Sequence, residues 1–213
     1  MSISIIVGAS GLVGTNILNQ LCAQKEQVIA LTRRPLANLP RHVNELIIDF
    51  DAFIKDGILP KCDHVFICLG TTIKIAGSQA QFRQVDFEYC LSVAKKASDS
   101  GAKTLSLISS IGADSSSKNF YLKTKGELEE AIQKLSFTSV NIFRPSFLIG
   151  NGGRLRTRLE NAVMKIAKVM DVFLMGSARK YRSVDAQLLA KTMTSKHYAH
   201  PGINYYFFDD LLT

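Results

Sequence analysis

One segment of the chain carries residue types that could move a proton. The stretch "SSIGADSSSKNFYLKTKGELEEAI" begins with Ser109 and Ser110 and places Tyr121 four residues before Lys125. On a helix this interval puts both side chains on one face. A tyrosine phenol has a reference pKa of about 10, and a nearby ammonium group favours its phenolate form. The single Tyr-x-x-x-Lys of the chain falls one loop after a strand that ends in serine.

These residues are suited to reactions at a carbonyl group. Tyr121 could give a proton to a carbonyl oxygen or take one in the reverse direction. A hydroxyl of Ser110, with Ser109 as the alternative, could hold that oxygen and support its developing charge. The competing interpretation is an exposed helix start with an incidental tyrosine and lysine. Which of these two interpretations holds depends on where the surrounding strands and helices place Tyr121 and Lys125.

Three glycines directly follow the first apolar run, in "SIIVGASGLVG". A turn between a strand and a helix offers free N–H groups and the positive end of the helix dipole to a phosphate. We expect a tight turn at Gly8, close approach of a pyrophosphate at Gly11, and tight helix packing at Gly14. The alternative is a glycine-rich turn without a ligand. The residues assigned to this phosphate-binding loop are Gly8, Ser10, Gly11, Leu12, Val13 and Gly14.

The end of the second apolar run bears on which dinucleotide would bind. NAD sites usually carry an acid there for the ribose 2′-OH, whereas an arginine accommodates the 2′-phosphate of NADP. This chain reads "ALTRRP", with Arg33 and Arg34 and no acid. A guanidinium makes forked, charge-assisted contacts with phosphate. The pattern favours NADP(H) over NAD(H), unless the two arginines before Pro35 are only exposed loop charges.

Short apolar runs alternate with amphipathic helical patterns along most of the chain. Strands are expected at residues 4–7, 28–32, 45–49, 64–70, 104–109 and 139–144. Helices are expected over 12–21 and 82–97, with Gly101 ending the second. Alternation of this kind predicts a doubly wound α/β fold around a parallel sheet. We expect one domain over residues 1–213, with roughly 151–200 forming a small helical C-terminal lobe over the site.

The motifs together resemble the short-chain dehydrogenase/reductase superfamily, which has a Rossmann fold. The similarity is greatest to its small atypical branch, which includes the Tat-interacting-protein-like proteins and is related to nucleoside-diphosphate-sugar epimerases. It is carried by "GASGLVG", "CLGTTIKIAG", "SSIGAD", "YLKTKGELE" and "FRPSFLIG", with "YRSVDAQLLA" further on. The serine-to-tyrosine interval is shorter than in typical superfamily members, and the chain is short for a full substrate domain.

The resemblance implies roles for particular residues. Tyr121 and Lys125 match the catalytic pair of the superfamily, and Ser110 or Ser109 matches its serine. The segment with Leu69, Gly70 and Thr71 would pass the adenosine ribose, and the segment with Pro145 and Phe147 would lie beside the nicotinamide. In this assignment Ser109, Tyr121 and Lys125 also line the cofactor, with Lys125 reaching the nicotinamide ribose.

Composition narrows the class of protein. The formal charge of +8 and the pI of about 9.4 favour anionic ligands, but no aromatic-interleaved basic motif indicates a nucleic-acid partner. Four cysteines show no CxxC pair, and no ligand set completes a metal site, so no metal is expected. The apolar runs are too short for a transmembrane segment, and no signal peptide is evident, so the sequence predicts a cytoplasmic protein.

Residues 151–180 are not assigned a role by motif. A basic stripe, at Arg154, Arg158, Lys165 and Lys168, runs beside an apolar one and would face water or an anionic partner. Thr72, Lys74, Phe147 and Tyr181 are candidate pocket walls.

Three functions remain open at this point. The first is an NADPH-dependent reductase of a small carbonyl compound or of a sugar-nucleotide-like substrate. The second is a non-catalytic NADPH-binding protein that acts through a protein partner or as a homodimer. The third is a basic nucleic-acid-associated protein that keeps the fold for structure only.

Overall fold

A parallel sheet forms the centre of the protein. The computed structural model describes residues 2–37, 39–150, 171, 174–195 and 200–212. Within these residues one sheet has seven strands in the order β3-β2-β1-β4-β5-β6-β9, all parallel. The strands are β1 (Ile3–Val7), β2 (Gln27–Thr32), β3 (Val43–Ile47), β4 (His64–Ile67), β5 (Thr104–Ile108), β6 (Ser139–Phe143) and β9 (Gly202–Tyr206). This order is doubly wound, and the predicted fold class is confirmed.

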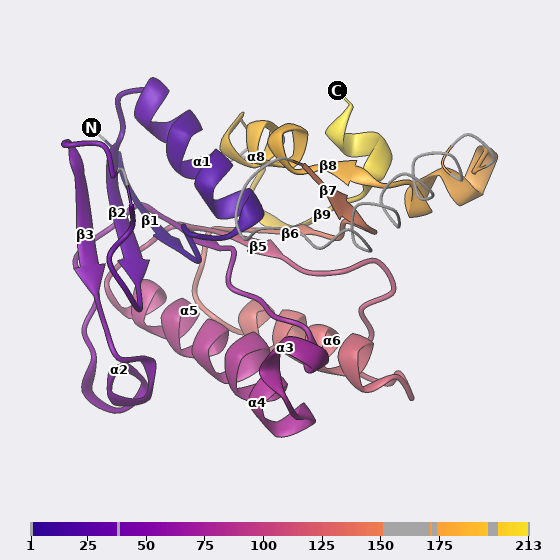
Figure 1. The fold of residues 1–213 in the computed structure, drawn as a ribbon, viewed down its shortest axis with the longest axis horizontal. Coiled ribbons are helices and arrows are strands. Elements are labelled where there is room, and N and C mark those ends of the chain that lie inside the picture. The colour runs from indigo at the N-terminus through magenta and orange to yellow at the C-terminus, as the bar shows by residue number, and fades with distance from the viewer. Residues whose placement is uncertain (1, 38, 151–170, 172–173, 196–199, 213) are drawn as a thin grey trace.

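Helices cover both faces of this sheet (Figure 1). One layer holds α1 and α8, and the other holds α2, α5 and α6. The main helices are α1 (Leu12–Ala23), α2 (Phe50–Asp56), α5 (Cys90–Asp99), α6 (Phe120–Gln133) and α8 (Ala186–Ser195). Shorter elements are α3 (Ile73–Ala76), α4 (Gln79–Arg83), β7 (Leu148–Ile149), β8 (Val184–Asp185), and the 3₁₀ helices over Gly176–Tyr181 and Phe208–Leu211. Strands β7 and β8 pair in parallel outside the main sheet.

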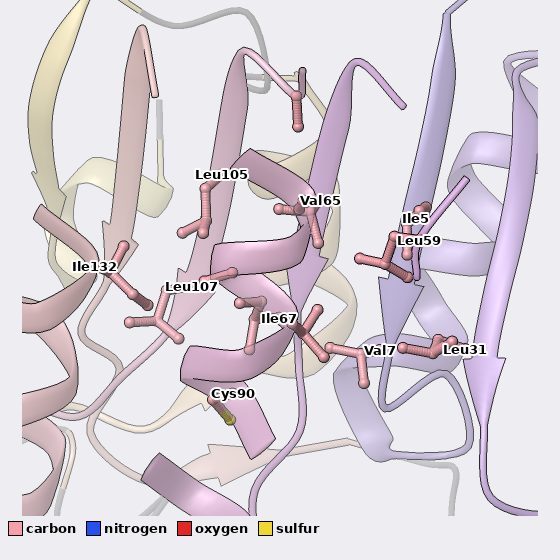
Figure 2. Packing of buried hydrophobic residues seen from close by; sticks show 14 of the residues in the cluster. Ile5, Val7, Leu31, Leu59, Val65, Ile67, Cys90, Leu105, Leu107 and Ile132 are labelled. Carbon is pink, nitrogen blue, oxygen red and sulfur yellow. The ribbon is translucent and has the colours of Figure 1, made fainter. Parts of the chain in front are cut away.

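Two apolar cores result from this arrangement. On one face, side chains of β1, β4 and β5 pack with α5 and α6, as Figure 2 shows for Ile67, Leu105 and Leu107. On the other face, α1 and α8 pack on the opposite side chains of the same strands, including Ile6 and Phe66. Because both faces are covered, the central strands are continuous apolar runs rather than alternating ones.

The predicted strands are all present, with shifted ends. Strand β4 ends at Ile67 rather than at Gly70, because Cys68 and Leu69 leave the sheet to pack against the turn at Gly8. Asp49 lies beyond β3, where its carboxylate accepts the Ala52 amide and caps α2.

The helix predicted over 82–97 is not a single regular α-helix. Helix α4 is followed by a π-helix over Gln84–Tyr89, which is followed by α5. Gly101 ends this helical segment with φ of +91°, as expected. A π-helix occurs mostly as a single turn within an α-helix and is frequently found at functional sites. In this chain the π-helix carries the buried acid Asp86.

The described C-terminal residues contribute to the second core and to one edge of the sheet. Within the range expected to form a lobe, α8 packs against α1, through Leu189 and Met193, as part of the second core. The basic stripe at 154–168 lies outside the described residues, so its placement, like the single-domain organisation, stays a prediction. In the described part of the chain, no helix is both long and apolar enough to cross a membrane.

The two isoleucines Ile67 and Ile58 allow a matched test of core packing. Ile67→Ala should lower the free energy of unfolding by about 2–5 kcal/mol, because its side chain is fully buried between β1, β5 and α5. Ile58→Ala should change it by less than about 0.5 kcal/mol, because that side chain is 86% exposed. Urea denaturation of both variants measures the difference, and equal losses would contradict the packing described for this face.

Candidate active site

The glycine loop (residues 8–14) is a point of backbone contact. Gly8 has φ of +86°, and the Gly11 amide donates a 2.9 Å hydrogen bond to the Gly8 carbonyl. A Cβ on Gly14 would lie 2.2 Å from that same carbonyl oxygen, and a Cβ on Gly8 would lie 2.6 Å from the carbonyl oxygen of Cys68. Both contacts are too close for any side chain. The glycines at 8 and 14 are therefore required to bring β1, α1 and the end of β4 together.

The start of α1 has no side-chain cap. Gly11 is the N-cap residue and, having no side chain, leaves the first amides of Leu12 and Val13 to another partner. Ser10 is exposed beside them, and the first turn of α1, which is described in full, contains no acidic residue. A helix start of this kind attracts an anion.

The segment after β4 crosses over the predicted catalytic pair. A Cβ on Gly70 would lie 3.3 Å from Asp86 Oδ1 and 3.8 Å from Lys125 Nζ. The Thr71 amide donates a 2.8 Å hydrogen bond to Asp86 Oδ2. Leu69 is half-buried and Gly70 is exposed. The structure therefore brings Leu69, Gly70 and Thr71 to the same edge of the sheet as the glycine loop.

Lys125 is buried and paired with an acid. Its Nζ lies 2.6 Å from Asp86 Oδ1, and the two side chains are only 6% and 1% exposed. Tyr121 lies one helical turn before Lys125 on α6 and is half-buried, with its ring 5.5 Å from that of Phe82. Tyr121 and Lys125 thus share one face of α6, which packs against the π-helix.

The electrostatics of the pair keep a positive charge at this position. Burial by itself would lower the pKa of Lys125, but the Asp86 carboxylate, with Tyr121 and Cys90, raises it above its ordinary value. Burial raises the pKa of the Asp86 carboxyl, against the opposing effects of Lys125 and the Thr71 amide. Lys125 is therefore an ammonium at neutral pH, one helical turn after Tyr121 on α6.

Asp86 was not among the predicted site residues. It lies four residues after Phe82 in the helix predicted over 82–97, so both side chains share one face, and both are fully buried. A buried carboxylate needs a partner of opposite charge or several hydrogen-bond donors. That rule was a usable signal, although sequence alone could not identify Lys125 as the partner.

The two candidate serines differ in what their hydroxyls do. The Ser109 hydroxyl donates to Glu129, which is 2% exposed on its side chain and also accepts from Arg144 Nη2 at 2.5 Å. Arg144 in turn lies 4.6 Å over the ring of Tyr205 on β9. Ser109 therefore belongs to a polar network that joins β5, α6 and β6. The Ser110 hydroxyl makes only a long 3.3 Å contact with the carbonyl of Ile111 among its described hydrogen bonds.

Backbone bonds extend the pairing of β5 and β6 beyond both strands. The Ser109 amide donates to the Phe143 carbonyl at 2.8 Å, and the Ile111 amide donates to the Pro145 carbonyl at 2.9 Å. Ser110 is therefore held beside Pro145.

The segment that follows Pro145 returns to the first helix. Phe147 is 46% exposed, and its carbonyl accepts the Val184 amide. A Cβ on Gly150 would lie 3.4 Å from Leu12 Cδ1. This segment consequently runs from the serine loop to the start of α1.

Arg33 and Arg34 lie further along the same edge, directly after β2, and both are exposed. The positive charge of Arg33 acts on the phenol of Tyr89 at the end of the π-helix. Burial and a 2.8 Å hydrogen bond to Asp51 nevertheless raise the pKa of Tyr89 to about 12. The two arginines therefore face solvent at the far end of the candidate site from Tyr121.

Other reactive groups near the site are unsuited to catalysis. Burial raises the pKa of Cys90 to about 12 and raises that of Cys68 further, so both stay protonated thiols. The four cysteines are all in the described part of the chain and are free. Among the described residues, no cluster of three or more His, Cys, Asp or Glu is placed to hold a metal ion.

The arrangement fits a dinucleotide. Gly8, Gly14 and Gly70 stand where a Cβ would meet backbone or the ion pair, and the helix start beside them has no side-chain cap. Such a surface lets a pyrophosphate approach the backbone closely. The other predicted residues, Tyr121, Lys125 and Pro145, lie along the same carboxyl edge, where ligands bind in open parallel sheets.

Sequence comparisons place the chain among nucleotide-binding proteins. A family model described as NAD(P)H-binding matches residues 8–170. Protein FMP52, mitochondrial, of Meyerozyma guilliermondii is 35% identical over 172 residues, which cover 78% of this chain and 74% of that protein. Protein HTATIP2 of Rattus norvegicus is 37% identical over 152 residues, 68% of this chain and 62% of that protein. These matches confirm the resemblance that the motifs indicated.

Solved structures share the fold at low sequence identity. The human epimerase family protein SDR39U1 with NADPH has a TM-score of 0.65 at 15% identity, covering 96% of this chain and 74% of that one. The UDP-glucose 4-epimerase of Thermus thermophilus with NAD has a TM-score of 0.68 at 14% identity, covering 99% and 81%. These two proteins bind different dinucleotides on the same fold, so the fold does not choose between NADP(H) and NAD(H).

The predicted cytoplasmic location is wrong. Several of the relatives matched, from Meyerozyma guilliermondii, Candida glabrata and Candida albicans, are named mitochondrial. The prediction relied on the short apolar runs and on the lack of an evident signal peptide, neither of which specifies a compartment.

The buried ion pair yields a stability prediction. Asp86→Asn should lower the free energy of unfolding by about 3 kcal/mol at neutral pH, because it leaves the Lys125 ammonium buried without its counter-charge. Adding Lys125→Met should recover most of that loss, because the buried charge is then gone. Urea denaturation of the single and double variants measures both effects. A single variant as stable as the native protein would contradict the pairing.

The loss in Asp86→Asn should also shrink as the pH rises from 7 toward 10. Without Asp86, burial lowers the pKa of Lys125 in the folded state, so the unfolded state binds more protons. Stability of the variant then rises with pH, whereas Lys125 of the native protein stays protonated in both states over this range. A gap between the two proteins that widens with pH would contradict this assignment.

Proposed function

Because the chain belongs to the NAD(P)H-binding family, we propose that it is an NADP(H)-dependent oxidoreductase of the short-chain dehydrogenase/reductase type. Its substrate would be a small carbonyl compound or alcohol, or a sugar-nucleotide-like molecule. The observation that carries the proposal is the buried Lys125–Asp86 contact beneath Gly70, one helical turn from Tyr121. Burying a charge is costly unless it is paired, and this pair keeps an ammonium one helical turn from a phenol at the carboxyl edge of the sheet.

In this proposal the cofactor lies along the carboxyl edge of the sheet. The amides and glycines of the glycine loop (residues 8–14) hold the pyrophosphate, with the Ser10 hydroxyl beside it. Arg33 and Arg34 contact the ribose 2′-phosphate. Leu69, Gly70 and Thr71 pass the adenosine ribose, and Pro145 and Phe147 flank the nicotinamide. When bound, the cofactor supplies or accepts hydride.

The residues of the chain would handle the proton and the charge. The Tyr121 phenol donates its proton to the carbonyl oxygen of the substrate. The Lys125 ammonium favours the negative charge left on that phenol and hydrogen-bonds the nicotinamide ribose. The Ser110 hydroxyl holds the reacting oxygen, a role for which Ser109 is less suited because its hydroxyl is committed to Glu129.

Cofactor choice is tested first by binding. Reduced cofactor fluoresces, and the chain contains no tryptophan to interfere, so titrations with NADPH and with NADH give both dissociation constants. NADPH should bind more tightly. Arg33→Ala should weaken NADPH by about 10- to 100-fold, the effect of losing a charge-assisted contact, and should change NADH little.

Arg41→Ala is the matched control. This exposed arginine precedes β3 and so lies at the amino ends of the strands, opposite the carboxyl edge that carries the candidate site. It should leave both dissociation constants unchanged. Equal losses for both cofactors in Arg33→Ala would remove that residue as the selector.

Catalysis is tested on Tyr121. With NADPH and a panel of small carbonyl compounds, Tyr121→Phe should lower the rate of NADPH oxidation by about 10²- to 10⁴-fold, because the proton donor is lost. The dissociation constant of NADPH should stay within about twofold of the native value, since one hydroxyl contributes little to binding.

Tyr205→Phe removes the same hydroxyl from β9, away from the glycine loop, and should remain active. Undiminished oxidation by Tyr121→Phe would eliminate the proposed donor.

A further inference from the structure

The two exposed arginines stand on a turn that one carboxylate closes from the neighbouring strand. Glu45 lies on β3, the edge strand beside β2 (Figure 1). Its Oε1 accepts the Thr32 hydroxyl at 3.0 Å and the Leu36 amide at 2.8 Å. Thr32 and Leu36 are the residues immediately before and after the segment Arg33-Arg34-Pro35. A single oxygen atom therefore ties both ends of this segment.

The sheet places Glu45 where it can make both bonds. In the parallel register Ala30 pairs with Glu45. Because side chains alternate along a strand, Thr32, two residues after Ala30, projects from the same face of the sheet as Glu45. Thr32 is buried, and its carbonyl also accepts the Ile48 amide at 2.8 Å. The first end of the turn is thus attached to β3 through both backbone and side chain.

The second end of the turn is held by packing as well. The Leu36 side chain packs against the core cluster beneath α1. Pro35 has a fixed φ and disfavours helical backbone in Arg34 before it. With Thr32 and Leu36 both tied to Glu45, the three residues between them have little freedom, and all three are exposed. The restraint therefore acts on the backbone that carries the two guanidinium groups.

We propose that Glu45 is the positioning residue for cofactor choice: by closing the turn it directs Arg33 and Arg34 toward the ribose 2′-phosphate. This inference rests on the proposed NADP(H) preference. An acid near the end of the second strand would ordinarily indicate an NAD site, where it accepts the ribose 2′-OH. Here the oxygen Oε1 already holds two donors of the chain itself, so Glu45 serves the turn instead of the ribose.

The two possible roles of Glu45, closing the turn or accepting the ribose hydroxyl, predict different results when glutamine replaces it. The amide oxygen of glutamine can accept the same two hydrogen bonds, so Glu45→Gln should preserve the turn. Alanine cannot accept either bond, and Glu45→Ala should release it. The informative quantity is the ratio of the NADH dissociation constant to the NADPH dissociation constant, because a general loss of structure weakens both cofactors and leaves the ratio unchanged.

The experiment is a fluorescence titration of the native protein and three variants with NADPH and NADH. Glu45→Ala should lower the ratio by about tenfold, the result of losing two ordinary hydrogen bonds that order the arginines. Glu45→Gln should keep the ratio within about twofold of the native value. Asp63→Ala removes a carboxylate that holds the Ile3 amide at the opposite edge of the sheet and should leave the ratio unchanged.

Three results would overturn the inference, and each has a distinct meaning. A native ratio near one would refute the NADP(H) preference itself and the role of Glu45 with it. A high native ratio that survives in Glu45→Ala would refute only the role of Glu45. A loss of NADH binding in Glu45→Gln, with NADPH binding retained, would show instead that the carboxylate accepts the ribose hydroxyl.

Discussion

Contact between three backbone segments at Gly8 is the constraint on which the rest of the site depends. The carbonyl of Gly8 touches α1 at Gly14, and the α-carbon of Gly8 faces the backbone of Cys68 and Leu69. No side chain fits at Gly8 or Gly14, so the turn, the first helix and the end of β4 must keep their relative positions. The next residue along, Gly70, carries this constraint to Asp86 and Lys125. One packing requirement thus connects the helix start that would hold phosphate to the ammonium beside Tyr121.

Asp86 supplies the counter-charge of the buried Lys125 in the interior of this site. A buried ammonium is costly to desolvate, and an acid at 2.6 Å with a second bond to the Thr71 amide offsets that cost. The π-helix lies between two regular helical segments and holds this acid in the interior. The same carboxylate therefore charges Lys125 and anchors the segment that passes over it, which couples the chemistry of α6 to the position of the loop after β4.

Carboxylates on neighbouring elements hold the other loops of this edge in the same manner. Glu129 on α6 joins Ser109 to Arg144, and Glu45 on β3 joins Thr32 to Leu36. Glu129 accepts bonds from two loops, those after β5 and β6, whereas Glu45 accepts bonds from the two ends of one turn. Loops positioned by a rigid scaffold are the usual place for ligand contacts. Glu129 and Glu45 accordingly hold loops of the candidate site in position.

The sequence by itself determined the sheet, the order of its elements and the location of the candidate site. Near-continuous apolar runs, glycines at 8, 11 and 14, and the Tyr121–Lys125 interval are local patterns, and each has one favoured structure. The ends of elements were less certain: β4 stops at Ile67, and the helix over 82–97 contains a π turn, because tertiary contacts at Gly8 and Lys125 override local propensity. The compartment was predicted wrongly, since composition does not encode it.

Only the tertiary structure decided which polar side chains meet. Along the chain Asp86 and Lys125 are 39 positions apart, Ser109 and Glu129 are 20 apart, and Thr32 and Glu45 are 13 apart. No periodicity relates such partners, because each pairing is created when separate elements pack at the edge of the sheet. The sequence could place a tyrosine and a lysine on one helical face, but the counter-charge that keeps the lysine protonated comes from another helix.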